Sequence, residues 1–203
     1  MSNYTGGYTN VRVRPLTPAG RRILETASGL FYDRGIHAIG VDAIAGAAGV
    51  TKKTIYDQFG SKDALVAAYL GARDERWRRH VTERVEREPA GSVERLLATY
   101  DALGEWMDRE NPRGCAFVNA AAELVEPGHP GLRVVHDEKR WLRGLYASLA
   151  AEAGAPEPDR LAAKLLTLHE GALVTYSVAG DRDAAATARE AAAELVAAAL
   201  AAR

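Results

Sequence analysis

The amino-acid sequence predicts an all-α protein of about nine helices. Apolar residues recur at three- and four-residue intervals through most of its 203 residues. No segment keeps the alternation of a strand, and the one β-branched cluster, LVTYSV at 173–178, continues a longer helical pattern. Stretches rich in glycine and proline punctuate the pattern where helices are expected to end.

The composition is that of an ordinary globular protein. It is 47% hydrophobic and 26% charged, and a chain of 203 residues can bury a sizeable core. No window approaches the roughly 18 apolar residues of a membrane span, and the first 15 residues lack the apolar centre of a signal peptide. We therefore expect a cytoplasmic protein with no membrane partner. The single cysteine, Cys115, excludes an internal disulfide and cannot by itself form a zinc site, so no metal or cofactor is predicted.

The charges are unevenly distributed along the chain. Residues 1–65 carry eight Lys and Arg against five Asp and Glu, whereas the remaining 138 residues carry 18 against 22. The N-terminal part is therefore basic, as expected where a protein meets a polyanion. Residues 1–16 have no helical period and are expected to form a flexible basic arm. Four arginines precede or open the first helix, where they could touch a phosphate backbone: Arg12, Arg14, Arg21 and Arg22. Arg12 and Arg14 have the alternative of being disordered and solvated.

The first helix is expected from Thr17 to Arg34. Thr17 is a good N-cap, Pro18 suits the first helical position, and an apolar stripe runs from Ile23 to Phe31 before Gly35. The second helix follows from an apolar pattern at i, i+3, i+4 and i+7, formed by Val41, Ile44, Ala45 and Ala48.

Gly49 makes the turn after the second helix, because glycine adopts the left-handed conformation with little cost. Thr51 caps a third, short helix with Ile55 and Phe59 on its inward face. The opposite face carries two lysines and a tyrosine, which can reach phosphate oxygens or guanine edges in DNA. Asp57 on the same helix is expected to be a local orienting partner.

Ser61 caps the next helix, with Lys62 at its first position, so free backbone amides and a cation lie together as at a phosphate-binding site. Residues 17–65 thus form a helix-turn-helix domain, with helix four leading onward. The alternative is a small three-helix core unit whose lysines are only solvated. The candidate DNA contacts are Thr51, Lys52, Lys53, Thr54, Tyr56, Ser61 and Lys62.

The run VDAIAGAAGVTKKTIYDQFGSKDAL at 41–65 resembles the DNA-binding domain of the TetR family of bacterial transcription regulators. The matching residues are Ile44-Ala45, Gly49-Val50, Thr51, Tyr56, Phe59 and Gly60-Ser61-Lys62. Lys53, often glycine in the family, and Asp57 depart from the pattern and bear on which operator is read. The resemblance implies non-enzymatic binding to double-stranded DNA, an inducer site in helices five to eight, and a homodimer formed through the last two helices.

Residues 66–203 are expected to form a ligand-binding and dimerisation domain. Helix four should run from Ser61 to about Glu88, where Pro89 and Gly91 stop it. Five further helices follow, ending with an alanine-rich helix from about Asp183 to Ala202. Helix eight, from Pro158 to Ala179, and this last helix are expected to supply half of an intermolecular four-helix bundle.

The segment RGCAFVNAAAEL at 113–124 is unusually apolar, yet Asn119 and Glu123 are four apart and share one face. Polar groups in such a setting either orient a mostly apolar ligand or are satisfied within an ordinary core. The same two interpretations apply to the aromatic and soft side chains of helices five to eight. The ligand candidates are Trp106, Met107, Phe117, Asn119, Glu123, Trp141, Tyr146, His169 and Tyr176.

The leading hypothesis is a ligand-responsive repressor that releases a palindromic operator when a small, largely apolar inducer binds. A helical enzyme is disfavoured, because the sequence has no nucleophile elbow, metal-ligand spacing or phosphate loop. A ligand-independent architectural DNA binder remains open. Cys115 is expected to be an inert small hydrophobe and not an oxidant sensor, since no second cysteine is present to resolve a sulfenic acid.

Overall fold

The computed structural model describes residues 16–202, so the expected arm and its Arg12 and Arg14 lie almost entirely outside the described residues. Within this range the protein has nine helices and no strand, which confirms the all-α prediction. Their bounds are α1 (Pro18–Arg34), α2 (Val41–Ala48), α3 (Lys52–Phe59), α4 (Lys62–Val85), α5 (Val93–Glu110), α6 (Ala116–Glu123), α7 (Pro130–Glu152), α8 (Pro158–Val178) and α9 (Ala184–Ala201).

Local signals set the boundaries of the first four helices. The hydroxyls of Thr17, Thr51 and Ser61 each accept a hydrogen bond from the backbone N–H three residues ahead. Gly49 ends α2 in the left-handed conformation, with φ +63°. Helix α4 ends three residues before the predicted Glu88. The backbone N–H groups of Arg87 and Glu88 instead bond the carbonyls three residues back, as in a 3₁₀ turn. Pro89 follows and cannot continue the helical hydrogen bonds.

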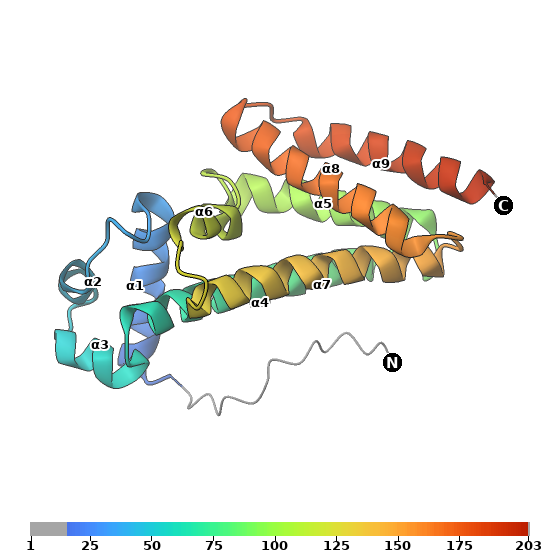
Figure 1. The fold of residues 1–203 in the computed structure, drawn as a ribbon. Coiled ribbons are helices and arrows are strands. Elements are labelled where there is room, and N and C mark those ends of the chain that lie inside the picture. The colour runs from blue at the N-terminus through green and yellow to red at the C-terminus, as the bar shows by residue number, and fades with distance from the viewer. Residues whose placement is uncertain (1–15, 203) are drawn as a thin grey trace.

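Helices α1 to α3 form one end of the molecule, and α4 leads away from them (Figure 1). Ile23, Ile44 and Ile55 are fully buried between the three helices and the start of α4. Burying an isoleucine stabilises the fold by roughly 1.5–3 kcal/mol, so these three residues contribute substantially to holding the short helices α2 and α3 in place. The predicted helix-turn-helix is confirmed.

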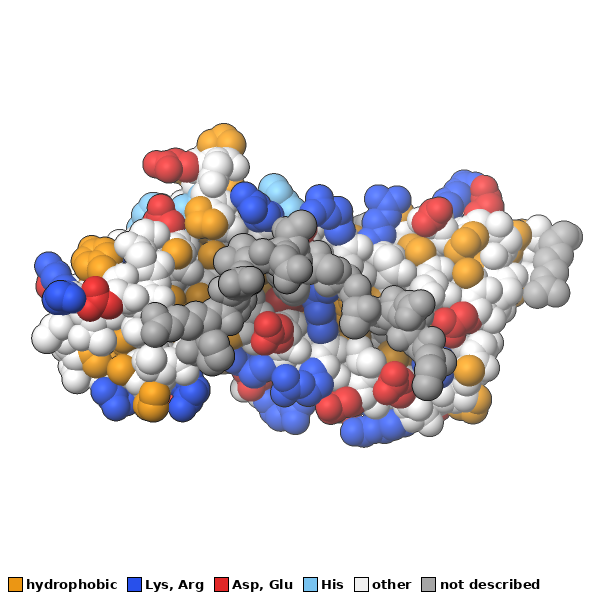
Figure 2. Space-filling view, turned by 90° about the horizontal axis from the view of Figure 1, so that it is seen from below, with side chains coloured by type: hydrophobic (Ala, Val, Ile, Leu, Met, Phe, Trp, Pro, Cys, Tyr) orange, Lys and Arg blue, Asp and Glu red, His pale blue; other side chains and the backbone are white. Residues whose placement is uncertain are grey.

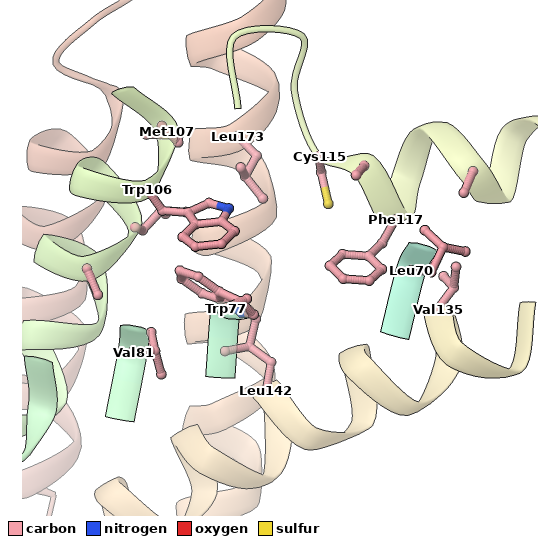
Figure 3. Packing of buried hydrophobic residues seen from close by; sticks show 14 of the residues in the cluster. Leu70, Trp77, Val81, Trp106, Met107, Cys115, Phe117, Val135, Leu142 and Leu173 are labelled. Carbon is pink, nitrogen blue, oxygen red and sulfur yellow. The ribbon is translucent and has the colours of Figure 1, made fainter. Parts of the chain in front are cut away.

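The C-terminal domain is built along α4 and α7, which pack side by side through the length of the molecule (Figure 1). Helices α5, α8 and α9 complete the bundle, and α6 lies across its end next to α1. The core includes the indoles of Trp77 and Trp106, whose ring centroids are 5.4 Å apart, with Phe117 of α6 nearby (Figure 3). In residues 16–202 no helix combines the length and apolarity needed to cross a membrane.

The apolar stripe of α8 packs inside its own chain. Four of the apolar residues that mark this helix in the sequence are buried against α5, α7 and α9: Leu161, Leu165, Ala172 and Tyr176. A second stripe of the same helix remains exposed, with Val174 at 55% and Val178 at 81% exposure. It also contains Thr167 and Gly171, which precede Val174 by seven and three residues along the helix.

Candidate DNA-binding surface and regulatory cavities

Helix α3 presents its two lysines to solvent, but each is paired with a carboxylate. Lys52 Nζ lies 2.7 Å from Asp42 of α2, and this contact raises the pKa of the lysine. Lys53 Nζ lies 2.7 Å from Asp57, one turn along the same helix, which agrees with the local role expected for this acid. Figure 2 shows basic and acidic side chains interleaved at this end of the molecule. Both pairs are exposed and weak, so DNA phosphates can displace the acids.

The remaining candidates surround these lysines. Tyr56 is 47% exposed, one turn beyond Lys52, with its ring available to a DNA backbone. Thr51 Oγ1 lies 2.9 Å from Thr54 Oγ1 and accepts the Thr54 backbone N–H, so both threonines are engaged in the cap. Ser61 caps α4 in the same way.

Lys62 is placed differently from the expectation. Its Nζ donates to the Ile36 carbonyl oxygen at 2.7 Å and lies over the Phe31 ring, so the side chain turns toward its own domain. A phosphate contact would need this bond to break, while the free amides at the start of α4 stay available. Arg21 and Arg22 are also used locally, donating to the carbonyl oxygens of Leu16 and Ala48.

The DNA-binding end is joined to the C-terminal domain through the hydroxyl of Tyr32 in α1. This hydroxyl donates to the Gly114 carbonyl oxygen at 3.0 Å and accepts the Arg113 backbone N–H at 2.9 Å. The Gly114 carbonyl and the Arg113 N–H both lie in the loop before α6. The contact ties α1 to the C-terminal domain across more than 80 residues of sequence.

Arg73 of α4 reinforces this junction, and sequence reasoning missed it. Its side chain is 5% exposed, and its guanidinium stacks on the Tyr32 ring, 4.5 Å from the centroid. The same guanidinium donates to the Glu110 carbonyl oxygen and to the side chain of Asn111. An arginine in the charged second half of helix four looked like solvated surface in the sequence, and only the approach of α5 shows otherwise.

Asn119 and Glu123 share one face of α6, as expected, but this face looks toward α1. They line a cleft of about 220 Å³ between α6 and the DNA-binding domain, here called the interdomain cleft. Glu123 Oε2 accepts the backbone N–H of His37 at 2.7 Å, and His37 Nε2 lies 2.6 Å from the Glu123 carbonyl oxygen. Because a carbonyl only accepts, that ring nitrogen carries a hydrogen. Asn119 donates to the Arg113 carbonyl oxygen at 3.0 Å.

Three other ligand candidates line a separate cavity at the centre of the C-terminal domain: Trp106, Phe117 and His169. Its volume is about 20 Å³, room for about one water molecule. The nine candidates therefore do not line one pocket, because Asn119 and Glu123 of α6 line the interdomain cleft whereas Phe117 of the same helix lines the central cavity.

The remaining four candidates are engaged in packing or hydrogen bonds. Met107 is buried, and Trp141 carries the Arg78 guanidinium 4.7 Å from its ring centroid. The Tyr146 hydroxyl lies 3.0 Å from His169 Nδ1, and the Tyr176 hydroxyl donates to Asp108 at 2.9 Å. Burial lowers the pKa of His169 to about 3, so this ring is neutral.

Charged groups also border the central cavity. Glu138 is 2% exposed, and burial raises its pKa to about 7 despite Lys139 Nζ at 3.1 Å. Lys139 donates to Glu170 at 2.7 Å and lies 3.8 Å from Cys115 Sγ. Burial raises the pKa of the Cys115 thiol, an effect larger than the opposing field of Lys139. A protonated, buried thiol agrees with the expectation that Cys115 is unreactive.

The fold and the α3 surface define a helix-turn-helix DNA-binding protein with a separate helical domain. Residues 23–69 match bacterial regulatory proteins of the tetR family, and residues 92–192 match the tetracyclin repressor-like C-terminal domain. The chain belongs to the TetR family of transcription regulators, which are non-enzymatic DNA-binding proteins.

Three similar proteins illustrate the relationship. An uncharacterized HTH-type transcriptional regulator of Mycobacterium tuberculosis strain H37Rv is 31% identical over 166 residues, 71% of this chain and 80% of that one. The HTH-type transcriptional activator FasR of Mycolicibacterium smegmatis is 34% identical over 116 residues, 57% of this chain and 44% of FasR. The crystal structure of a TetR-family regulator from Streptomyces coelicolor superposes with a TM-score of 0.84 at 30% identity, covering 91% of each chain.

Proposed function

We propose that this regulator is a cytoplasmic, homodimeric repressor that binds a palindromic operator through α3 and releases it when a small molecule binds the C-terminal domain. The observation that carries the proposal is the exposed face of α3. Lys52, Lys53 and Tyr56 project from a helix that is held by a buried isoleucine and a capping threonine. Such a helix fits the major groove, where lysines reach guanine edges and phosphates.

The exposed stripe of α8 supports dimerisation through the last two helices. Val174 and Val178 are large apolar side chains left in solvent, and Gly171 on the same stripe permits close helix approach. A two-fold axis here would place two copies of α3 for successive major grooves, about 34–36 Å apart. A palindromic site follows from that symmetry.

The release step is supported by how α4 and α6 meet α1. Arg73 of α4 stacks on Tyr32, and the loop before α6 bonds the same tyrosine. A ligand that prefers a different position of α6 would change the orientation of α1 and so the spacing of the reading helices. It acts only as far as it binds the two orientations differently.

Footprinting of genomic fragments tests the proposal directly. The dimer should protect palindromic sites, with an affinity that falls steeply as salt rises, because phosphate contacts release counterions. Tyr56→Phe and Lys62→Ala should weaken all sequences alike, whereas Lys52→Ala or Lys53→Ala should change preference at one base step by about 1–3 kcal/mol. Absence of protection at low salt by the folded dimer would contradict operator binding.

The sign of regulation needs its own experiment, because FasR is named an activator. A reporter gene placed behind a footprinted site should be expressed more strongly when the regulator is deleted. Weaker expression after deletion would make the protein an activator, with DNA binding unaffected by that result.

A further inference from the structure

The interdomain cleft is an open space lined by polar and apolar groups of both domains. Its apolar walls are Phe31 and Ile36 from the DNA-binding domain and Ala116 and Ala120 from α6. A dry engineered cavity of about 150 Å³ holds benzene, so a cleft of about 220 Å³ has room for a one-ring molecule. An occupant would touch both domains at once.

The cleft is lined by a tyrosine hydroxyl that has no partner among the described residues. Tyr69 of α4 lines the cleft and is 3% exposed, and its hydroxyl makes no hydrogen bond with any residue in the described part of the chain. Its ring packs on Phe31, with centroids 5.8 Å apart, which holds the side chain in this direction. Buried hydroxyls are nearly always hydrogen-bonded, so a ligand oxygen or a water is expected here.

The charge around the cleft favours an anion. The Arg113 guanidinium lines the cleft and forms no ion pair within the described residues, since only its backbone groups are bonded. Behind the aromatic walls, Lys62 lies over the Phe31 ring and Arg73 over the Tyr32 ring. Among the lining residues of this cleft the one carboxylate is Glu123, which already accepts the His37 N–H. Within the lining, Arg113 is therefore the one cation whose side chain is left for an anion, while Lys62 and Arg73 add positive charge from behind the rings.

We propose that the interdomain cleft binds a small organic acid, with its carboxylate on Arg113, an oxygen accepting the Tyr69 hydroxyl hydrogen, and its apolar body against Phe31 and Ile36. This inference rests on the proposed ligand-responsive function and names the class of ligand. Because Phe31 belongs to α1 and Arg113 to the loop before α6, the bound acid joins the two domains. It changes the position of α1 against the rest of the chain as far as it binds one position more tightly than the other.

Calorimetric titration of the full chain with benzoate, in the absence of DNA, tests the binding. Saturable binding of one benzoate per chain is expected, with the neutral benzamide and the cationic benzylammonium binding at least about tenfold more weakly. Tyr69→Phe should weaken benzoate about tenfold, since it removes a buried hydrogen bond to a charged group. Arg113→Gln should weaken it about fivefold, since that cation is partly screened by water.

Arg133→Gln is the matched control, because it removes an exposed arginine of α7 that lies outside the cleft. It should leave benzoate binding unchanged, and circular dichroism establishes that each variant is folded. Equal binding of benzoate and benzamide, no saturable binding, or unchanged affinity in both cleft variants would overturn the inference.

A second arm measures operator affinity with and without saturating benzoate. Coupling is reciprocal, so the factor by which benzoate changes operator affinity must equal the factor by which the operator changes benzoate affinity. Benzoate binding with no change in operator affinity would overturn the regulatory part of the inference. Because the titration needs no DNA, failure of operator binding contradicts the proposed function and leaves the cleft assignment standing, and the reverse also holds.

Discussion

The DNA-reading surface and the junction around α6 use their polar side chains in opposite ways. On α3 the contacts stay within the DNA-binding domain: Lys53 pairs with Asp57 of the same helix, Lys52 pairs with Asp42 of α2, and Gln58 accepts a hydrogen bond from Thr17. At the junction they span the chain, since His37 bonds Glu123 from 86 residues away. The helix-turn-helix domain of residues 17–65, here called the reader, is therefore a self-contained unit. The junction, in contrast, exists only when both domains are in place. The proposed release of the operator would require both properties.

The largest expected effect tests whether the reader unit has its own stability. Ile55→Ala removes three carbons from a fully buried side chain and should cost about 2–5 kcal/mol. The loss should appear in urea unfolding followed by hydrogen exchange of α2 and α3, with α7 still protected. Leu142→Ala, at an equally buried site of α7, is the control and should destabilise the C-terminal domain first. Simultaneous unfolding of all helices in both variants would show that the reader is not independent.

The junction should be almost as sensitive. Arg73→Met keeps the length of the stem but leaves the Glu110 carbonyl and the Asn111 side chain without their donor, at a cost of about 2–3 kcal/mol. Operator affinity should fall as well, although Arg73 is on no DNA-facing surface. Arg76→Met, on the exposed side of the same helix, should change neither quantity by more than about 0.5 kcal/mol. Unchanged operator binding in the Arg73 variant would show that the junction does not couple the C-terminal domain to DNA binding.

The sequence predicts the reader well because its determinants lie within a few residues of each other. The caps at Thr17 and Thr51 and the left-handed Gly49 are local signals, and all three hold in the structure. Lys62 shows the limit, because its partner, Ile36, is brought to it by folding from 26 residues away. The orientation of a long side chain depends on such distant partners, even where its position on the helix is correct.

The ligand candidates show the same limit more strongly. Residue type and spacing placed Asn119 and Glu123 on one face of α6, which is correct. Which space that face meets depends on the docking of α1, a contact between residues more than 80 apart in sequence. The sequence does not mark Tyr69 as a site residue, because an unpartnered hydroxyl can be recognised only after all its neighbours are known.

The buried acid of the central cavity predicts a pH dependence of intermediate size. Burial raises the pKa of Glu138 to about 7, above its unfolded value, so the folded state holds an extra proton between about pH 4.5 and 7. The stability contributed by this proton is present below the unfolded pKa and is lost as the pH rises through about 7. Glu138→Gln should therefore be more stable than the parent at pH 8, by about 1.4 kcal/mol for each unit of the shift.

Urea unfolding of both proteins at pH 5 and pH 8 gives the measurement. His169 has the opposite sign, because its lowered pKa makes folding less favourable as the pH falls from about 6.5 toward 3. The variant must therefore be compared with the parent at each pH, so that the histidine contribution cancels. An equal difference at both pH values would show that Glu138 keeps an ordinary pKa in the folded protein.

The smallest effect on stability should come from the ion pair between Lys53 and Asp57 on α3. Breaking this pair should change operator affinity without a matching change in stability. Asp57→Asn removes the partner of Lys53 in an exposed pair and should change the free energy of unfolding by less than about 0.5 kcal/mol. Operator affinity should nevertheless rise, because the lysine no longer has to leave a carboxylate and a negative charge near the phosphates is gone. Electrophoretic mobility shifts at several salt concentrations measure this. Asp33→Asn, an exposed acid of α1, controls for net charge. Equal gains in both variants would assign the effect to net charge and not to the freed lysine.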